Sequence, residues 1–295
     1  LEGDAGLRQA VHAAETAQTG LDYFDSWAAE LIETGYLHNH ARMWFASIWI
    51  FTLKLPWRLG ADFFLRNLLD GDPASNTLSW RWVAGLHTRG KPYVAQASNI
   101  ARFTEDRFMP RAQELTQSAS GLEALEPGGL PECNPPRVPN APQLHLPTAL
   151  LLTEEDCRIE DFPFQDLICT AAATLAASPL RSPREVAQLV VRFEAGALAD
   201  VAQRSGLAVS AMQIGAPSDL ARWALQSGAQ QIVTPYVPVG PLRDWLARAQ
   251  PELEAAGISL TEWRRDWDAM IWPHATAGFF KVKKQIPKFL RTICA

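Results

Sequence analysis

The spacing of hydrophobic positions divides the chain into two parts. In the first part, apolar side chains recur three and four residues apart, which is the pattern of amphipathic helices. The pattern covers residues 7–17, 23–34, 38–55, 60–69 and 76–85. Glycine and proline continue helices poorly, and they occur between these segments, at Gly20 and in the turn 70–73. We therefore expect residues 1–117 to form a mostly helical domain.

Residues 118–147 are rich in proline and glycine. They contain seven prolines, each of which fixes φ and lacks the backbone N–H that a helix or an inner strand needs. Such a stretch is typical of a linker or of a connection that follows the surface. We place the domain boundary here.

After residue 147 the pattern changes to short apolar runs separated by helical stretches. The runs 149–153, 208–214 and 231–236 are typical of buried strands, and another strand begins at 257–260. Helical spacing returns near 183–205, 217–227 and 240–256. Strands that alternate with amphipathic helices form a parallel sheet covered by helices. The predicted fold class is therefore an all-helical domain followed by a small parallel α/β domain at 148–295.

Composition narrows the expected partners and location. The net charge is −5, so contact with DNA would need a local basic patch. The longest apolar run, 44–55, contains Lys54 and is too short to span a bilayer, so we expect no membrane partner. The cysteines form no C-x-x-C pair, which argues against a metal site and favours a reducing, cytoplasmic location. They are Cys133, Cys157, Cys169 and Cys294.

Residues 35–85 combine polar and aromatic side chains at helical spacing. Asn39, Arg42 and Met43 fall on one face of a predicted helix, because positions three and four apart are helical neighbours. The following turn offers two carboxylates, and an amide stands four residues before a tryptophan. These are Asp70 and Asp72 in the turn, then Asn76 and Trp80. We expect a polar cluster beside aromatic rings.

This ordered set resembles the flavin-binding core of the photolyase and cryptochrome family. The resemblance rests on H-N-H-A-R-M from His38, L-L-D-G-D-P-A-S-N from Leu68 and W-R-W from Trp80, and it runs over residues 17–108. It implies an FAD-binding helical domain that is incomplete at its N-terminus, since the part that grips the diphosphate would precede Leu1. One departure is His40, which stands where the family has an arginine near DNA.

The α/β half is similar to the antenna domain of that family, which the family places first, so the order here would be permuted. It lacks the family's usual opening strand signature, and binding of an antenna chromophore is therefore left open.

The resemblance also implies roles for individual residues. The positions that would surround FAD are Asn39, Arg42, Asp70, Asp72 and Asn76, with Asn76 facing the flavin N5. The alternative is structural: Arg42 and Asp70 form an ion pair, and Asn76 caps a helix. A buried carboxylate needs a charged partner, and Arg42 supplies one to Asp70 in the flavin site as well as in the structural alternative.

Three tryptophans complete the implied site. Trp80 and Trp57 match two members of the chain that passes electrons to photoexcited flavin, and core packing is the alternative role. Trp82 matches a position that lines the pocket for a pyrimidine dimer, together with Met43 and Asn39. An exposed helix aromatic is the alternative for Trp82.

The resulting expectation is a monomeric flavoprotein that binds DNA containing pyrimidine dimers. Light-driven electron transfer from reduced FAD would split the dimer, with Asn76 and the two relay tryptophans as catalytic residues. A pyrimidine dimer is hidden in the base stack, so such an enzyme takes its substrate out of the duplex. The alternatives are a cryptochrome-type blue-light photosensor without repair activity and a non-catalytic truncated remnant.

Overall fold

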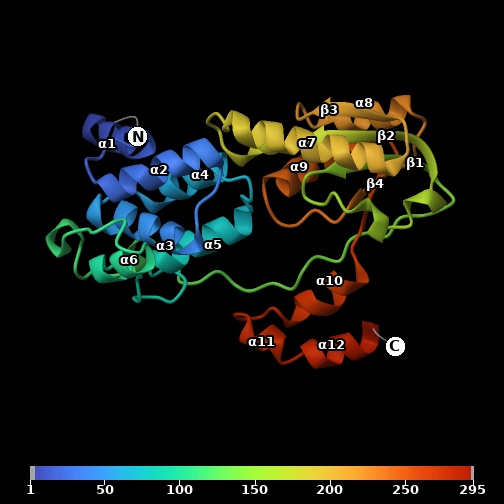
Figure 1. The fold of residues 1–295 in the computed structure, drawn as a ribbon. Helices are drawn as coiled ribbons and strands as arrows, with labels where there is room; N and C mark the ends of the chain where they lie inside the picture. The colour runs from blue at the N-terminus through green and yellow to red at the C-terminus, as the bar shows by residue number, and fades with distance from the viewer. Residues whose placement is uncertain (1–3, 294–295) are drawn as a thin grey trace. The chain divides into compact units, whose positions relative to one another are not determined.

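The computed structural model describes residues 4–293, which form two compact units (Figure 1). Unit 1 comprises Leu1–Leu130 and Ser178–Phe193, and unit 2 comprises Pro131–Ala177 and Glu194–Ala295. Unit 1 thus includes a segment from far along the chain. The expected domains 1–117 and 148–295, with their connection 118–147, stay predictions.

Unit 1 is built from helices. Five of them follow the expected amphipathic segments, with ends shifted by a few residues, and a short sixth helix was not expected. They are α1 (Ala5–Glu15), α2 (Asp22–Thr34), α3 (Asn39–Ser47), α4 (Trp57–Asn67), α5 (Pro73–Val83) and α6 (Ala97–Phe103). The expected helix 38–55 is shorter because α3 changes into a π-helical turn, Ile48–Thr52, that the Leu53 N–H closes on Ile48 O at 2.8 Å. Lys54 then has a φ of 56°, which ends the helix.

The core of unit 1 is aromatic. Phe24 stacks on Phe45 with ring centroids 4.2 Å apart, and Phe45 contacts both Phe64 and Trp49. These residues come from four different segments of the chain and are almost fully buried. Burying large rings contributes about 2–3 kcal/mol each, so this cluster fixes how α2, α3 and α4 pack.

Unit 2 contains a parallel sheet, as the sequence predicts. Its strand order is β3-β2-β1-β4-β5, and every neighbouring pair is parallel. The strands are β1 (Pro147–Thr153), β2 (Ile168–Ala176), β3 (Val209–Gln213), β4 (Gln231–Pro235) and β5 (Ser259–Trp263). The order reverses between β1 and β4, which is the doubly wound arrangement.

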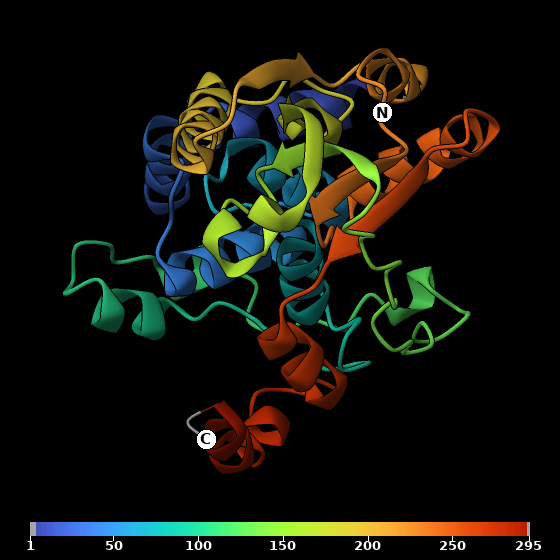
Figure 2. The ribbon, with the colours of Figure 1, turned by 90° about the vertical axis from the view of Figure 1, so that its right-hand side faces the viewer.

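Three helices connect these strands (Figures 1 and 2). They are α7 (Gln188–Ser205), α8 (Ser218–Gln226) and α9 (Pro241–Ala255). Parallel crossovers are right-handed, so α7, which leads outward from β2 to β3, covers one face, while α8 and α9 cover the other. The packing of α8 against α9 agrees with this assignment.

Strand β2 and the start of helix α7 differ from expectation. Strand β2 was not predicted, because its sequence I-C-T-A-A-A-T-L-A is rich in alanine, a helix former. It is a strand because β1 and β3 pair with it on both sides. Helix α7 begins at Gln188 rather than near 183, after a turn that contains Ser182 and Pro183.

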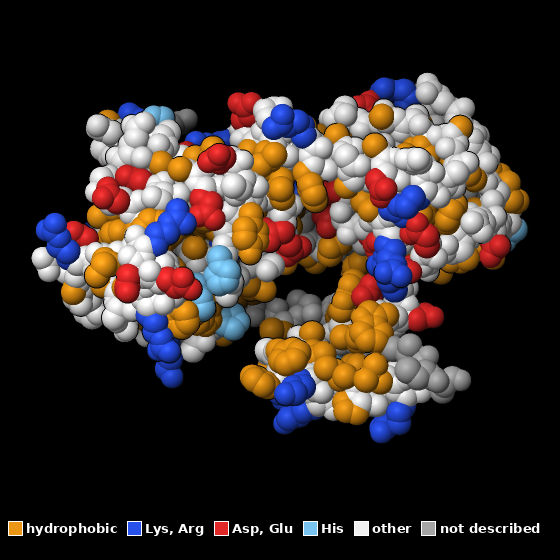
Figure 3. Space-filling model, viewed as in Figure 1, with side chains coloured by type: hydrophobic (Ala, Val, Ile, Leu, Met, Phe, Trp, Pro, Cys, Tyr) orange, Lys and Arg blue, Asp and Glu red, His pale blue; other side chains and the backbone are white. Residues whose placement is uncertain are grey.

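The described end of unit 2 contains three short helices, and its lysines lie in and between the last two. The helices are α10 (Asp266–Ile271), α11 (Phe280–Lys283) and α12 (Ile286–Ile293). Figure 3 shows hydrophobic side chains bordered by basic ones on this segment. Phe279, Phe280 and Leu290 in the segment are exposed. No helix within residues 4–293 combines the length and the apolar character that crossing a membrane requires. Cys133, Cys157 and Cys169 are free thiols, and Cys294 lies outside the described residues.

Candidate functional site

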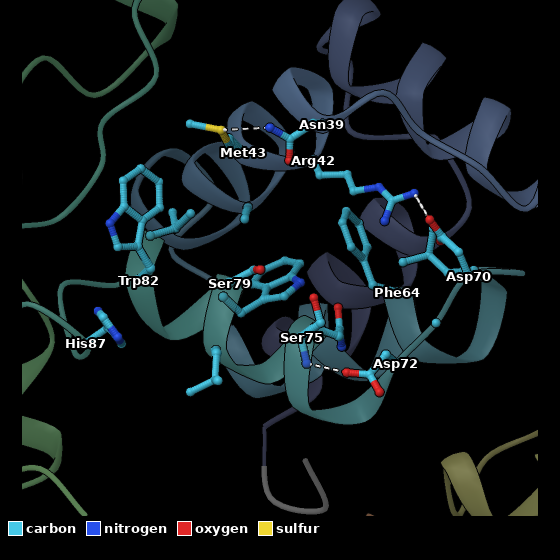
Figure 4. A pocket seen from close by; sticks show the side chains of 17 residues that line it. Asn39, Arg42, Met43, Phe64, Asp70, Asp72, Ser75, Ser79, Trp82 and His87 are labelled. Carbon is cyan, nitrogen blue, oxygen red and sulfur yellow. Dashed lines mark hydrogen bonds and ion pairs between the residues drawn. The ribbon is translucent and has the colours of Figure 1, made fainter. Parts of the chain in front are cut away.

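A pocket of about 450 Å³ lies in unit 1 between α3, α5 and the loop that precedes α5 (Figure 4). Eight of the nine residues that the sequence singled out line it. They are Asn39, Arg42, Met43, Asp70, Asp72, Asn76, Trp80 and Trp82. The ninth, Trp57, is the first residue of α4 and is not among the lining residues. Two separated sequence motifs therefore meet at one cavity.

Arg42 joins α3 to the loop before α5. Its Nη2 donates to both Asp70 carboxylate oxygens at 3.0 and 2.9 Å, and its Nε donates to Leu37 O at 2.8 Å. The Arg42 side chain is 25% exposed and that of Asp70 is 55% exposed. A pair this accessible contributes at most about 1 kcal/mol to stability. The pair thus leaves a cation at the pocket wall within reach of a ligand.

The sequence Asp72-Pro73 starts helix α5. The Asp72 carboxylate accepts a hydrogen bond from the Ser75 N–H at 2.6 Å, and proline occupies the first helical position. Asp72, rather than Asn76, is therefore the helix cap. This corrects the structural alternative for Asn76.

Asn76 is anchored to α4 and still has hydrogen-bonding capacity for the pocket. Its Nδ2 donates one hydrogen to Ala61 O on α4 at 2.8 Å, and its second N–H is not used by this bond. The carbonyl oxygen Oδ1 of this lining residue is an acceptor. The site therefore offers a hydrogen-bond acceptor at Asn76, which suits an N–H group of a ligand.

Trp80 lies one turn beyond Asn76 on α5 and forms the pocket floor. It is 2% exposed, and its ring contacts Phe64 at 5.1 Å and Trp49 at 6.2 Å, both edge to face. Gly60 on α4 makes this position available, because a Cβ there would collide with the Trp80 ring and lie 3.0 Å from Trp49. The indole is held on three sides.

Asn39, Met43 and Trp82 form the open rim of the pocket (Figure 4). The Asn39 amide lies 3.9 Å from the Met43 sulfur, a weak contact that leaves the amide accessible. Trp82 is 39% exposed and stacks on Tyr93, with centroids 5.4 Å apart. Burial raises the pKa of Tyr93, and a hydrogen bond with Trp44 partly offsets this. The rim thus presents an amide, a thioether and an aromatic face.

Sequence reasoning did not single out several residues that line or support this site, and four of them show why. Ser79 lines the pocket and follows Ser75 by four residues, so helical spacing on α5 contained that signal. His87 also lines it but follows the end of α5, where no periodicity applies. Gly60 and Trp49 act through the Trp80 ring, and no motif indicated either.

Asp25 and His40, which do not line the pocket, have structural roles. Asp25 braces the turn before α2, accepting hydrogen bonds from the Thr19 and Gly20 N–H groups at 3.0 Å each. His40 stacks on Trp44, with centroids 5.7 Å apart. Within the described part of the chain, no three His, Cys, Asp or Glu side chains are grouped to hold a metal ion.

Comparison with known proteins gives matches for the part of the chain that forms the pocket. Residues 2–111 match the family described as the FAD binding domain of DNA photolyase. The deoxyribodipyrimidine photo-lyase of Streptomyces griseus is 44% identical over 82 residues, which are 28% of this chain and 18% of that protein. The enzyme of the same description from Neurospora crassa is 37% identical over 114 residues, which are 39% of this chain and 18% of that one. No solved structure gives a significant match.

The pocket lies within the stretch of the chain that matches this FAD-binding family. Residues 2–111 are similar to the FAD binding domain of DNA photolyase, and this match supports the photolyase/cryptochrome family, with FAD as the cofactor of this domain. The matched part spans about a fifth of the length of each of these curated relatives.

Proposed function

We propose that the pocket binds the isoalloxazine ring of FAD. The observation that carries the proposal is that eight residues from two separated motifs line one cavity of about 450 Å³. Its apolar floor, Trp80 and Phe64, suits a flat ring, and its polar groups occupy the edges. The donor set fits the flavin, because the ring offers acceptors and an N–H along its edges.

Each polar residue then has a defined task. Arg42 supplies positive charge for the anionic edge of a reduced flavin, while Asp70 keeps the guanidinium oriented at 2.9–3.0 Å. Asn76 Oδ1 accepts a hydrogen bond from an N–H of the ring, while the bond from Nδ2 to Ala61 O anchors the amide. Asn39 and Asp72 complete the edge contacts.

Trp80 and Trp57 are proposed to supply electrons to the site. Trp80 is the buried indole that lines the cavity, and Trp57 is the first residue of α4, 8% exposed. The Arg58 and Arg81 guanidinium groups lie over the Trp57 ring at 5.6 and 6.0 Å. Bound flavin supplies the light-absorbing, one-electron chemistry, and the protein supplies binding, orientation and electrostatics.

The substrate is proposed to be a pyrimidine dimer in DNA. Trp82, Met43 and Asn39 form an accessible rim beside the ring site, and aromatic and thioether groups suit the faces of bases. The dimer would receive an electron from reduced FAD under light, split, and return the electron. The two relatives described above are both named deoxyribodipyrimidine photo-lyase, and this name supports the proposal.

The test is repair of a dimer-containing oligonucleotide under blue light by protein loaded with chemically reduced FAD. Trp82→Ala is expected to weaken dimer binding by about tenfold, because base stacking on an aromatic contributes about 1–3 kcal/mol. Trp80→Phe is expected to keep this repair and to lose photoreduction of oxidised FAD, because phenylalanine is much harder to oxidise. Photoreduction without any repair by the parent protein would instead indicate the photosensor.

A further inference from the structure

Segment Ser178–Phe193 belongs to unit 1, although it lies far beyond the residues that match the family. The Ala187 N–H donates to Arg66 O at 3.0 Å. Arg184 forms a two-pronged pair with the Glu15 carboxylate at 2.5 and 2.6 Å, and Arg66 reaches the same carboxylate at 2.9 Å. The Glu15 side chain is only 8% exposed, so the shared carboxylate anchors the segment to α1 and α4.

Arg181 in this segment contacts the C-terminal end of α4. Its Nη1 donates to Leu68 O at 3.0 Å and approaches Leu65 O at 3.5 Å. The last carbonyls of a helix have no partner within the helix and carry partial negative charge. A guanidinium at this place therefore satisfies them and favours one conformation of the chain that follows.

The chain that follows is the wall of the pocket. The Gly71 N–H also donates to Leu68 O, at 3.2 Å, so the carbonyl that Arg181 binds is the one on which the loop closes. A Cβ added at Gly71 would lie 2.9 Å from Arg181 Nη1, which shows how closely the loop rests on the guanidinium. Asp70 and Asp72, on either side of Gly71, line the cavity.

We propose that Arg181 is a positioning residue of the pocket, which fixes the loop 68–72 so that Asp70 meets Arg42 and Asp72 caps α5. The inference deepens the proposed function and rests on it for the identity of the ligand. It assigns to the ring site a residue outside the matched domain, so the site depends on a segment that follows β2.

The test compares Arg181→Met with Arg181→Lys in the full chain. Riboflavin serves as the probe, because it carries the ring without the diphosphate. Arg181→Met is expected to weaken riboflavin binding by about tenfold, since a charge-assisted hydrogen bond to a partly buried group is lost. Arg181→Lys keeps one charged donor for Leu68 O and should recover most of the affinity. Arg222→Met, which removes an exposed pair with Asp219 in unit 2, is the control and should bind as the parent does.

Amide hydrogen exchange of the ligand-free protein separates this inference from the proposed function. Arg181→Met should speed exchange at Leu69 and Gly71, whose N–H groups hold the loop, while the core of α2 exchanges as before. In one outcome, the parent binds no riboflavin while Arg181→Met still shows this selective increase in exchange. In that case the flavin proposal fails and the positioning role stands. Unchanged exchange and affinity in Arg181→Met would overturn the inference. So would a uniform increase in exchange across unit 1.

Discussion

Gly60 has no side chain, and this leaves the space that the Trp80 indole occupies at the pocket. The Trp80 ring occupies the space in which a Gly60 side chain would stand, and Trp49 closes the same space from the other side. The sequence marked Trp80 through its spacing from Asn76. It could not mark Gly60, because the contact joins two helices.

Gly60→Ala should therefore destabilise unit 1 by about 1–3 kcal/mol through overpacking. The displaced indole should also change the intrinsic tryptophan fluorescence, measured together with urea unfolding. Gly196→Ala in α7 is the control, because nothing lies within 4 Å of a Cβ there. It should be neutral or stabilising by up to about 1 kcal/mol. Equal stability of the parent and Gly60→Ala would show that Trp80 is not confined as described.

Tyr23 carries a buried hydroxyl with no hydrogen-bond partner among the described residues. Burial, with a smaller contribution from Glu114, raises its pKa from 10.0 to about 12. A raised acid pKa means that the folded state favours the protonated phenol. The contribution of the protonated Tyr23 phenol to the free energy of unfolding is fully present below pH 10 and is lost as the pH rises towards 12.

Tyr23→Phe removes both features, because it deletes the unsatisfied hydroxyl and keeps the ring. At neutral pH we expect unchanged or slightly higher stability, by up to about 1 kcal/mol. Between its ordinary pKa of 10.0 and about 12, the parent should lose more stability than the variant. Urea unfolding followed by circular dichroism at several pH values measures the difference. A large loss of stability at neutral pH would reveal a partner for the hydroxyl.

At the scale of elements, helix α5 links local sequence to the site. Its start is set by Asp72 and Pro73, and the same start places Asn76, Ser79 and Trp80 along the pocket. Helical spacing was sufficient to predict this helix and the face it presents. It was not sufficient for β2, because pairing with two neighbouring strands overrides the helix preference of alanine.

Asp72→Ala should cost about 1 kcal/mol of unfolding free energy, because the Ser75 N–H loses its cap. Asp72→Ser keeps a capping oxygen and should restore most of it. Asp4→Ala, which uncaps α1 away from the pocket, is the matched control. All three should be compared by urea unfolding and riboflavin titration. If Asp4→Ala weakened riboflavin binding as much as Asp72→Ala, general destabilisation would explain both.

At the scale of the whole molecule, the sequence predicted the parallel α/β architecture of unit 2 and the convergence of two motifs in unit 1. Those features follow from periodicity and from a contiguous resemblance. The contribution of residues 178–193 to unit 1 could not be predicted, because Arg181 and Arg184 find partners more than a hundred residues away. Long-range ion pairs leave no periodic trace in a sequence.

The central claim, that the pocket holds a flavin ring, is tested most directly by titrating the chain with riboflavin and FAD. We expect one equivalent of each to bind, with affinities within about tenfold, because the lining residues surround a ring-sized cavity. Ser79→Trp should abolish binding by filling the cavity, whereas Thr77→Trp, exposed on α5 and outside the lining, should leave it intact. Equal binding by Ser79→Trp and the parent, or no binding by the parent, would contradict the account.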